Sequence, residues 1–185
     1  MTTALLIIDV QNAVLEGEGT PDRQPAIDAA FTETTLRLRS VQERARAADI
    51  PVIFVQHDSG RGDTLARPSQ GWELRLEIRP LPGETVVHKT SCDSFFHTAL
   101  QDELQKRAIT HLVIGGCQTP YCVDTTARRA VSLGYGVTLL SDGHMTGDRG
   151  ALTFTQIIAH HNAVLGGFNA GSHVVELRRC DEITF

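Results

Sequence analysis

Residues 111–130 read HLVIGGCQTPYCVDTTARRA, which is the most informative stretch of the chain. Its apolar start is typical of a buried strand, the pair Gly115 and Gly116 permits a tight turn, and the remainder is typical of a helix. Cys122 then falls in the first turn of that helix, where unpaired backbone N–H groups and the helix dipole favour a thiolate over a thiol. The alternative is a structural cysteine, because free cysteines are among the most buried residues.

Two other apolar runs also end in a chemically useful residue. Residues 4–8 (ALLII) are followed by Asp9, and residues 85–88 (TVVH) are followed by Lys89. Taken singly, the acid is typical of a cap or turn and the lysine of a solvated strand end. In open parallel sheets, however, ligands bind beyond the carboxyl ends of the strands. We therefore predict that Asp9, Lys89 and Cys122 converge in one crevice.

Short apolar runs alternate with helical patterns along the whole chain, which is typical of repeated strand–helix–strand units. Strands are predicted at residues 4–8, 51–56, 85–88, 111–115, 136–140 and 173–177, and helices at about 25–48, 98–107, 121–133 and 152–165. This order predicts a three-layer α/β fold, a doubly wound, Rossmann-like sheet of six mainly parallel strands flanked by helices. Residues 58–82 form one long loop, which we expect to be a lid or an interface.

Composition restricts the class of protein. A chain of 185 residues, 41% hydrophobic and 21% charged, predicts a single globular domain over residues 1–185. A net charge of −5 without a basic run argues against a nucleic-acid partner. The first apolar run is too short for a signal peptide or a membrane span, so we expect a cytoplasmic protein with no membrane partner. The four cysteines form no CxxC pair, which predicts reduced thiols.

Five motifs spread over nearly the whole chain point to one family. They are ALLIIDVQN at 4–12, VHKT at 87–90 followed by Ser94, Phe95 and Thr98, GGCQTPYCVDTT at 115–126, GYGVTLLSD at 134–142 and IIAHHN at 157–162. With these motifs the chain resembles the isochorismatase-like cysteine hydrolases, which include nicotinamidases, N-carbamoylsarcosine amidase and other small-amide hydrolases. The resemblance implies the isochorismatase-like hydrolase fold, a small-molecule substrate and a homo-oligomer, either a dimer or a larger assembly.

The resemblance also implies roles for individual residues. Cys122 is expected to attack an acyl carbon, with Asp9 as the general base and Lys89 as the electrostatic partner of both groups. The resemblance implies an oxyanion hole made by the backbone N–H groups of Gln118 and Cys122, presented by a cis peptide bond between Cys117 and Gln118. We expect Lys89→Ala to lose activity with little loss of folding.

Other expectations concern the pocket and metals. The candidate pocket residues are Gln11, His57, Trp72, Phe95 and Tyr121, and the participation of Cys92 is left open. Nicotinamidases carry a metal site built on an Asp-x-His motif and a further downstream histidine. Here the corresponding region reads VQHD at 55–58, and no histidine occurs between 59 and 87. Because zinc and iron sites need three or four convergent ligands, we predict no metal site and no cofactor.

The sequence therefore predicts a hydrolase that cleaves an amide, lactam or carbamoyl C–N bond through a thioester at Cys122. One alternative is a vinyl-ether hydrolase of the isochorismatase type, which needs acid catalysis rather than a thiol nucleophile. Another is a non-catalytic thiol redox or binding protein on the same fold. Modification of Cys122 by iodoacetamide should inactivate the first of these, whereas a vinyl-ether hydrolase could survive it.

Overall fold

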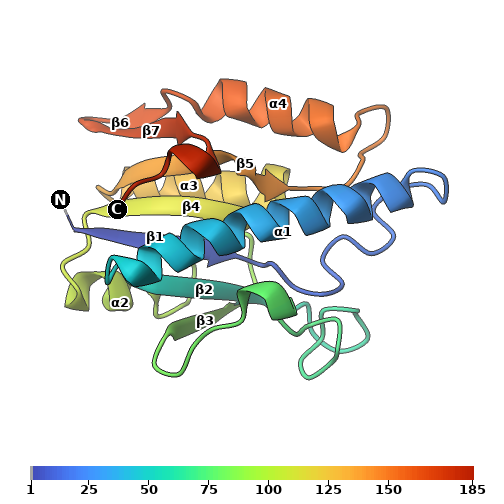
Figure 1. The fold of residues 1–185 in the computed structure, drawn as a ribbon, viewed down its shortest axis with the longest axis horizontal. Coiled ribbons are helices and arrows are strands. Elements are labelled where there is room, and N and C mark those ends of the chain that lie inside the picture. The colour runs from blue at the N-terminus through green and yellow to red at the C-terminus, as the bar shows by residue number, and fades with distance from the viewer. Residues whose placement is uncertain (1) are drawn as a thin grey trace.

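The computed structural model describes residues 2–185 and shows one twisted sheet with helices on both faces (Figure 1). The strands are β1 (Thr3–Ile8), β2 (Val52–His57), β3 (Thr85–Lys89), β4 (His111–Cys117), β5 (Gly136–Met145), β6 (Asn169–Ala170) and β7 (His173–Arg178). The α-helices are α1 (Gln24–Ala47), α2 (Leu100–Lys106), α3 (Asp124–Ser132) and α4 (Phe154–Leu165). None of the helices formed by residues 2–185 has both the length and the apolar character needed to cross a bilayer.

The strand order is β3-β2-β1-β4-β5-β7-β6, and every neighbouring pair is parallel except β6 and β7. The predicted α/β class with a mainly parallel sheet is confirmed, and all six predicted strands are present. The predicted number of six strands is wrong, because the two-residue strand β6 pairs antiparallel with β7. A strand of two residues is too short to show the alternating pattern by which strands are recognised.

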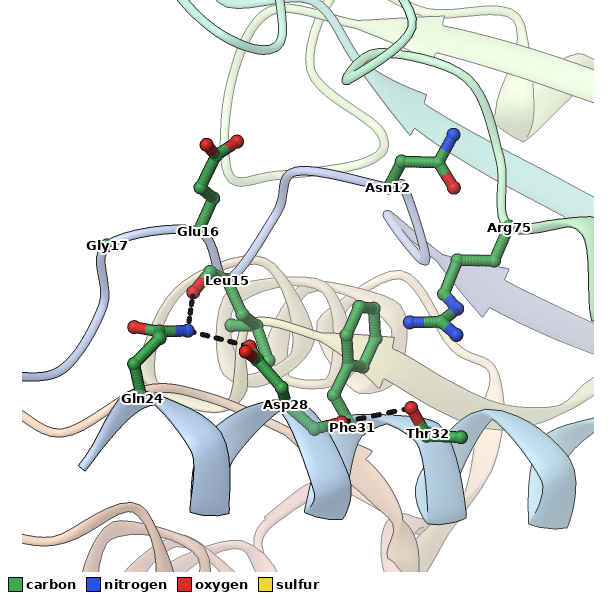
Figure 2. A pocket seen from close by; sticks show the side chains of 9 residues that line it. All are labelled: Asn12, Leu15, Glu16, Gly17, Gln24, Asp28, Phe31, Thr32 and Arg75. Carbon is green, nitrogen blue, oxygen red and sulfur yellow. Dashed lines mark hydrogen bonds between the residues drawn. The ribbon is translucent and has the colours of Figure 1, made fainter. Parts of the chain in front are cut away.

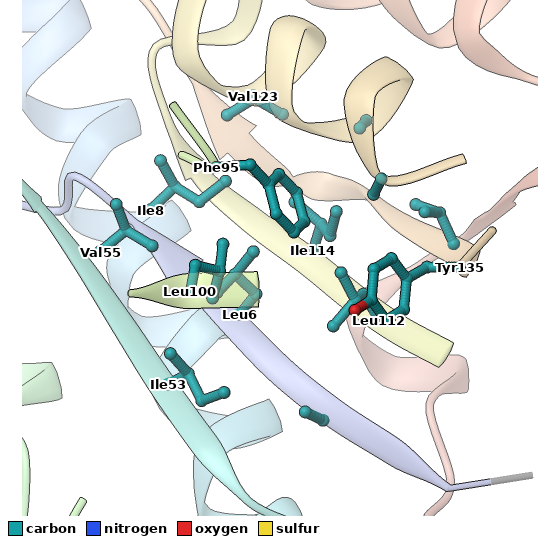
Figure 3. Close-up of a cluster of buried hydrophobic side chains, with 14 of the residues drawn as sticks. Leu6, Ile8, Ile53, Val55, Phe95, Leu100, Leu112, Ile114, Val123 and Tyr135 are labelled. Atoms are coloured by element: carbon teal, nitrogen blue, oxygen red, sulfur yellow. The ribbon is translucent and has the colours of Figure 1, made fainter. Parts of the chain in front are cut away.

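Burial on both faces of the sheet explains the uninterrupted apolar run of β1. Leu6 and Ile8 belong to a buried cluster that also contains side chains from α2 and α3 (Figure 3). Leu5 and Ile7 belong to a second cluster, on the side covered by α1. Because side chains alternate along a strand, a strand in the middle of such a sheet must be apolar at every position. The clusters fix the strands so that their carboxyl ends lie at one edge, opposite the two chain termini (Figure 1).

A close approach between β1 and β4 requires glycine at one position. Gly116 has a φ of 129°, and a Cβ atom there would lie 2.0 Å from the carbonyl oxygen of Ile8. No side chain fits at that distance, so the two strands can pack this tightly only with glycine. The approach occurs one residue before Asp9 and Cys117, and it brings the ends of β1 and β4 together.

Candidate active site

The structure brings Asp9, Lys89 and Cys122 into direct contact. The ammonium Nζ of Lys89 lies 2.6 Å from Oδ2 of Asp9 and 3.1 Å from Sγ of Cys122. Asp9 follows β1, Lys89 ends β3, and Cys122 lies in the helical turn that follows β4. All three are buried, with exposed fractions of 1%, 2% and 8%. Their position beyond the strand ends is where open α/β sheets bind ligands.

Asp9 is held in an unusual backbone conformation. Its φ is 51°, in the left-handed region that residues other than glycine rarely adopt. The backbone N–H of Asp9 donates to the carbonyl of Val55, and the carbonyl of Asp9 accepts from the N–H of Gln11, both at 2.9 Å. Such a conformation costs on the order of 1–3 kcal/mol, and it persists only where surrounding contacts hold it, commonly at functional sites.

The local helix around Cys122 differs from the predicted one. Thr119–Val123 form a turn of π-helix, and the α-helix α3 begins only at Asp124. Burial and the neighbouring carboxylate of Asp9 raise the pKa of Cys122 above its ordinary value, although the ammonium of Lys89 opposes the shift. A turn of π-helix therefore takes the place of the α-helix start that the sequence predicted at Cys122. Burial, which the sequence does not reveal, disfavours the charged thiolate.

The ion pair between Lys89 and Asp9 sets the resting charge of the site. Burial disfavours the ammonium of Lys89, but the carboxylate of Asp9 and the sulfur of Cys122 outweigh burial and raise the pKa of Lys89. The second carboxylate oxygen, Oδ1 of Asp9, is buried and has no hydrogen-bond partner among residues 2–185. A carboxylate oxygen of Asp9 and Sγ of Cys122 lie within 4.8 Å of each other. Asp9 is therefore placed to accept the thiol proton.

His57 completes the surroundings of the ammonium. Its Nδ1 lies 3.1 Å from Nζ of Lys89, and because an ammonium only donates, Nδ1 is the acceptor and Nε2 carries the proton. Burial and the charge of Lys89 lower the pKa of His57, so the ring is neutral at pH 7. Asp9, His57 and Cys122 offer three ligand atoms that could hold a metal. The charged Lys89 already bonds to all three, so this donor set does not fit a divalent cation.

Asp9, His57 and Cys122 line a small cavity of about 180 Å³. Of the predicted pocket residues, His57 and Tyr121 line it, as does Gln118 of the expected oxyanion hole. The lining also includes Cys92, whose participation the sequence left open. Three further lining residues, Val14, Ser59 and Leu65, were not named as pocket residues from the sequence. Ser59 and Leu65 belong to the long loop at 58–82, which thus supplies part of the cavity wall.

Three predicted pocket residues lie elsewhere. Gln11 is fully buried, and its side chain binds the backbone N–H and carbonyl of His57 and the carbonyl of Trp72, so it positions the loop instead. The ring of Trp72 packs against His88, with 5.5 Å between centroids. Phe95 lies in the hydrophobic cluster of Figure 3, stacked on Tyr135 at 6.0 Å. The side chains of Gln11, Trp72 and Phe95 therefore hold the loop or pack the core, because each contacts residues that are distant in sequence.

The turn from Cys117 to Val123 forms the floor of the site. The peptide bond between Cys117 and Gln118 is cis. The carbonyl of Gln118 accepts hydrogen bonds from the N–H groups of Tyr121 and Val123, at 3.1 and 3.2 Å. Gln118 and Cys122, which the sequence predicted as the oxyanion-binding residues, both line the cavity.

A larger cavity of about 320 Å³ lies beside α1 (Figure 2). The amide of Gln24 donates there to the carbonyl of Leu15 at 2.9 Å and to the carboxylate of Asp28 at 2.7 Å. The guanidinium of Arg75 lies 4.9 Å from the centre of the Phe31 ring. No cysteine or histidine belongs to the lining that the described residues form, so this cavity lacks a nucleophile and base of the kind found near Lys89.

Comparisons with known proteins agree on one family. A family model described as the isochorismatase domain matches residues 3–171. A streptothricin hydrolase of Streptomyces noursei is 38% identical over 146 residues, which cover 78% of this chain and 50% of that protein. The ureidoacrylate amidohydrolase RutB of Caulobacter vibrioides is 31% identical over 176 residues, covering 79% of this chain and 78% of that protein.

Solved structures agree as well. A crystal structure of an isochorismatase family protein is 31% identical and superimposes with a TM-score of 0.77, covering 96% of this chain and 98% of the other. The chain spans about half the length of the streptothricin hydrolases that it matches.

Proposed function

The chain belongs to the isochorismatase family of hydrolases, as its motifs predicted, and from that membership we propose that it cleaves a C–N bond of a small amide, lactam or carbamoyl compound. The single observation that carries the proposal is that Asp9 and Cys122, which both line the cavity, are bonded to the buried ammonium of Lys89. The names of two relatives, a streptothricin hydrolase and a ureidoacrylate amidohydrolase, support it.

The first half of the reaction forms a thioester. Asp9 accepts the proton of the Cys122 thiol while the sulfur attacks the acyl carbon of the substrate. Lys89 keeps its charge and stabilises the sulfur as its negative charge develops, which removes the obstacle set by the raised pKa of Cys122. The electron pair of the carbonyl moves onto oxygen, where the backbone N–H groups of Gln118 and Cys122 stabilise it. The tetrahedral intermediate collapses, and protonated Asp9 gives its proton to the leaving nitrogen.

The second half returns the free enzyme. The amine leaves, and Asp9, again a carboxylate, takes a proton from a water molecule that attacks the thioester carbon. The carbon–sulfur bond breaks, the acid product departs, and the proton returns to the sulfur. Neutral His57 lines the cavity, and its Nε2–H is a donor that could bind an acceptor atom of the substrate. Asp9 thus acts as the base in both halves of the reaction, because it alternates between the carboxylate and the protonated form.

The two alternatives make different demands on the site. Vinyl-ether hydrolysis begins with protonation of the substrate and does not use a nucleophilic sulfur, so it gives no role to the bond between Lys89 and Cys122. A redox role needs a second accessible thiol near Cys122. Cys117 is fully buried, but Cys92 is partly exposed and lines the same cavity, so a disulfide between Cys122 and Cys92 that persists in a reducing buffer would favour the redox role. The contact between Lys89 and Cys122 favours the acyl transfer reaction. The homo-oligomer and the cytoplasmic location expected from the sequence stay predictions.

A hydrolysis screen tests the proposal. The protein is incubated with a panel of amides, ureas, lactams and carbamoyl compounds, and the released ammonia or amine is measured. For any compound that is hydrolysed, Cys122→Ala should lower kcat/KM by at least about 1000-fold, because the covalent route is removed. Cys180→Ala is the matched control, since it removes a thiol that is buried in the carboxyl-terminal helical turn Cys180–Glu182. More than about a tenth of the activity left in Cys122→Ala would contradict the proposal.

A further inference from the structure

We propose that Arg149 is a positioning residue, which acts through the side chain of Gln118 to hold the oxyanion-binding turn in place. The inference rests on the proposed function, because Gln118 supplies one of the two backbone donors to the developing oxyanion. Arg149 itself follows β5 and touches no reacting atom in this arrangement. Its role would therefore be to keep a donor in position rather than to donate.

The side chain of Gln118 is fully used in hydrogen bonds. Its Nε2 donates to the carbonyl of Val14 at 2.9 Å and to Oε1 of Glu18 at 3.3 Å. Its Oε1 accepts from Nη2 of Arg149 at 3.0 Å and from the hydroxyl of Thr146 at 3.3 Å. A primary amide has two donor hydrogens and two acceptor positions, and here all four are occupied. The amide therefore has no spare bond for a substrate and serves as an anchor.

Arg149 joins the parts of this anchor. Its Nη1 pairs with Oε2 of Glu18 at 2.5 Å, so the same carboxylate meets both Arg149 and Gln118. The guanidinium also lies over the ring of Tyr121, 5.4 Å from the ring centre. Tyr121 and Gln118 both line the cavity and belong to the same turn. Arg149 thus restrains that turn at two points.

Glycine at position 147 makes room for the anchor. A Cβ atom on Gly147 would lie 2.3 Å from Cβ of Glu18 and 2.5 Å from its carbonyl oxygen. The segment after β5 can therefore pack against the segment after β1 only with glycine at this position. Two loops from separate strands meet at Gln118, and its backbone N–H is fixed by contacts made through its own side chain.

Loss of this restraint should weaken oxyanion binding specifically. A displacement of about 1 Å at a reacting group costs on the order of 100-fold in rate. Removal of one oxyanion donor costs about 100- to 1000-fold. Since Arg149→Met leaves the donor present but less well held, we expect an effect of about 10- to 100-fold on any step in which charge develops on the carbonyl oxygen.

Two probes of Cys122 separate positioning from general damage, and neither requires the natural substrate. Propanal adds reversibly to the thiol. A carbon–sulfur bond forms, the thiol proton passes to Asp9, and the carbonyl electron pair moves to oxygen, which stays in the adduct as an oxyanion held by the backbone donors. Iodoacetamide is attacked at its methylene carbon, so iodide leaves and no charge develops on a carbonyl oxygen. Only the first reaction depends on the oxyanion-binding turn.

The experiment compares Arg149→Met with wild type. The expected result is a dissociation constant for propanal that is about 10- to 100-fold larger, with the rate of Cys122 alkylation by iodoacetamide within about threefold of wild type. Arg149→Lys, which keeps a donor but loses the planar fork, should give a smaller loss. Thermal unfolding of each variant shows that it is folded.

Arg128→Met is the matched control. Arg128 pairs with Asp124 at 2.9 Å and lies over the ring of Phe168 at 4.6 Å, and its side chain is 36% exposed against 39% for Arg149. It makes no contact with Gln118, so its loss should leave propanal binding unchanged. An unchanged propanal constant in Arg149→Met, an equal loss with both probes, or the same loss in Arg128→Met would overturn the inference. Failure of the proposed function is read separately, in the hydrolysis screen: a wild type that hydrolyses no compound of the panel would overturn the proposed function, even where Arg149→Met still weakens propanal binding.

Discussion

Replacement of Lys89 by methionine tests the energetics of the site, because it removes the charge but keeps an unbranched chain. The side chains of Lys89 and Asp9 are 0% and 2% exposed, and their charged atoms lie 2.6 Å apart. Removal of one partner leaves the other charge buried without compensation, which costs about 3–5 kcal/mol in comparable pairs. We therefore expect Lys89→Met to lose that much stability, in contrast to the sequence-based expectation of little loss of folding.

A double-mutant cycle shows whether the pair is the cause. Asp9→Asn alone leaves Lys89 buried without its carboxylate, whereas the double variant Asp9→Asn with Lys89→Met removes both charges. The double variant should lose less unfolding free energy than the two single variants lose in sum, and the difference should be roughly 1–3 kcal/mol. Urea unfolding at pH 7 measures the four free energies of unfolding, those of wild type, the two single variants and the double variant, provided that the slope with denaturant is unchanged.

Activity gives the second measurement in the same variants. Each single variant and the double variant should lose at least about 100-fold in kcat/KM, because the base or its partner is gone. A loss of stability below about 1 kcal/mol in Lys89→Met, or strict additivity in the double variant, would refute the energetic reasoning. A near-normal kcat/KM in Lys89→Met would refute the reasoning that Lys89 takes part in catalysis.

Three further predictions test other parts of the structure. Burial lowers the pKa of His144 from its ordinary 6.5 to about 4, so below pH 6.5 the unfolded chain binds a proton that the folded protein does not. Stability should fall by up to about 3 kcal/mol as the pH drops from 6.5 towards 4, and His144→Gln should flatten that slope in urea unfolding. Iodoacetamide should label Cys122 and spare the fully buried Cys117 in a peptide map, and equal labelling would contradict the described burial. Gly116→Ala should prevent stable folding, because its Cβ would lie 2.0 Å from the carbonyl oxygen of Ile8, and a normal thermal unfolding curve would contradict this.

Features set by local sequence and strand topology were predictable. The run at residues 4–8 identifies a strand buried on both faces, and the order of strands and helices identifies the parallel sheet. Because parallel strands end at one edge, Asp9 and Lys89 could be placed near Cys122 without coordinates. Family resemblance supplied what spacing could not, such as the cis bond before Gln118, which the structure contains.

Features that depend on packing between distant segments were not predictable. Phe95 is apolar and close to the site in sequence, but only the fold shows that Tyr135 covers it. The pKa of Cys122 depends on how much water reaches the sulfur, which no local pattern records. Likewise, nothing in the sequence around Arg149 indicates that it bonds to a side chain 31 positions earlier.

Mass mapping of the enzyme during turnover tests the central claim most directly. Wild type and Asp9→Asn are mixed with an amide that wild type hydrolyses, quenched in acid at successive times, digested and analysed by mass spectrometry. We predict an added acyl group on the peptide that contains Cys122, longer-lived in Asp9→Asn because deacylation loses its base. An acyl group on a different residue, or undiminished hydrolysis by Cys122→Ala, would contradict the claim.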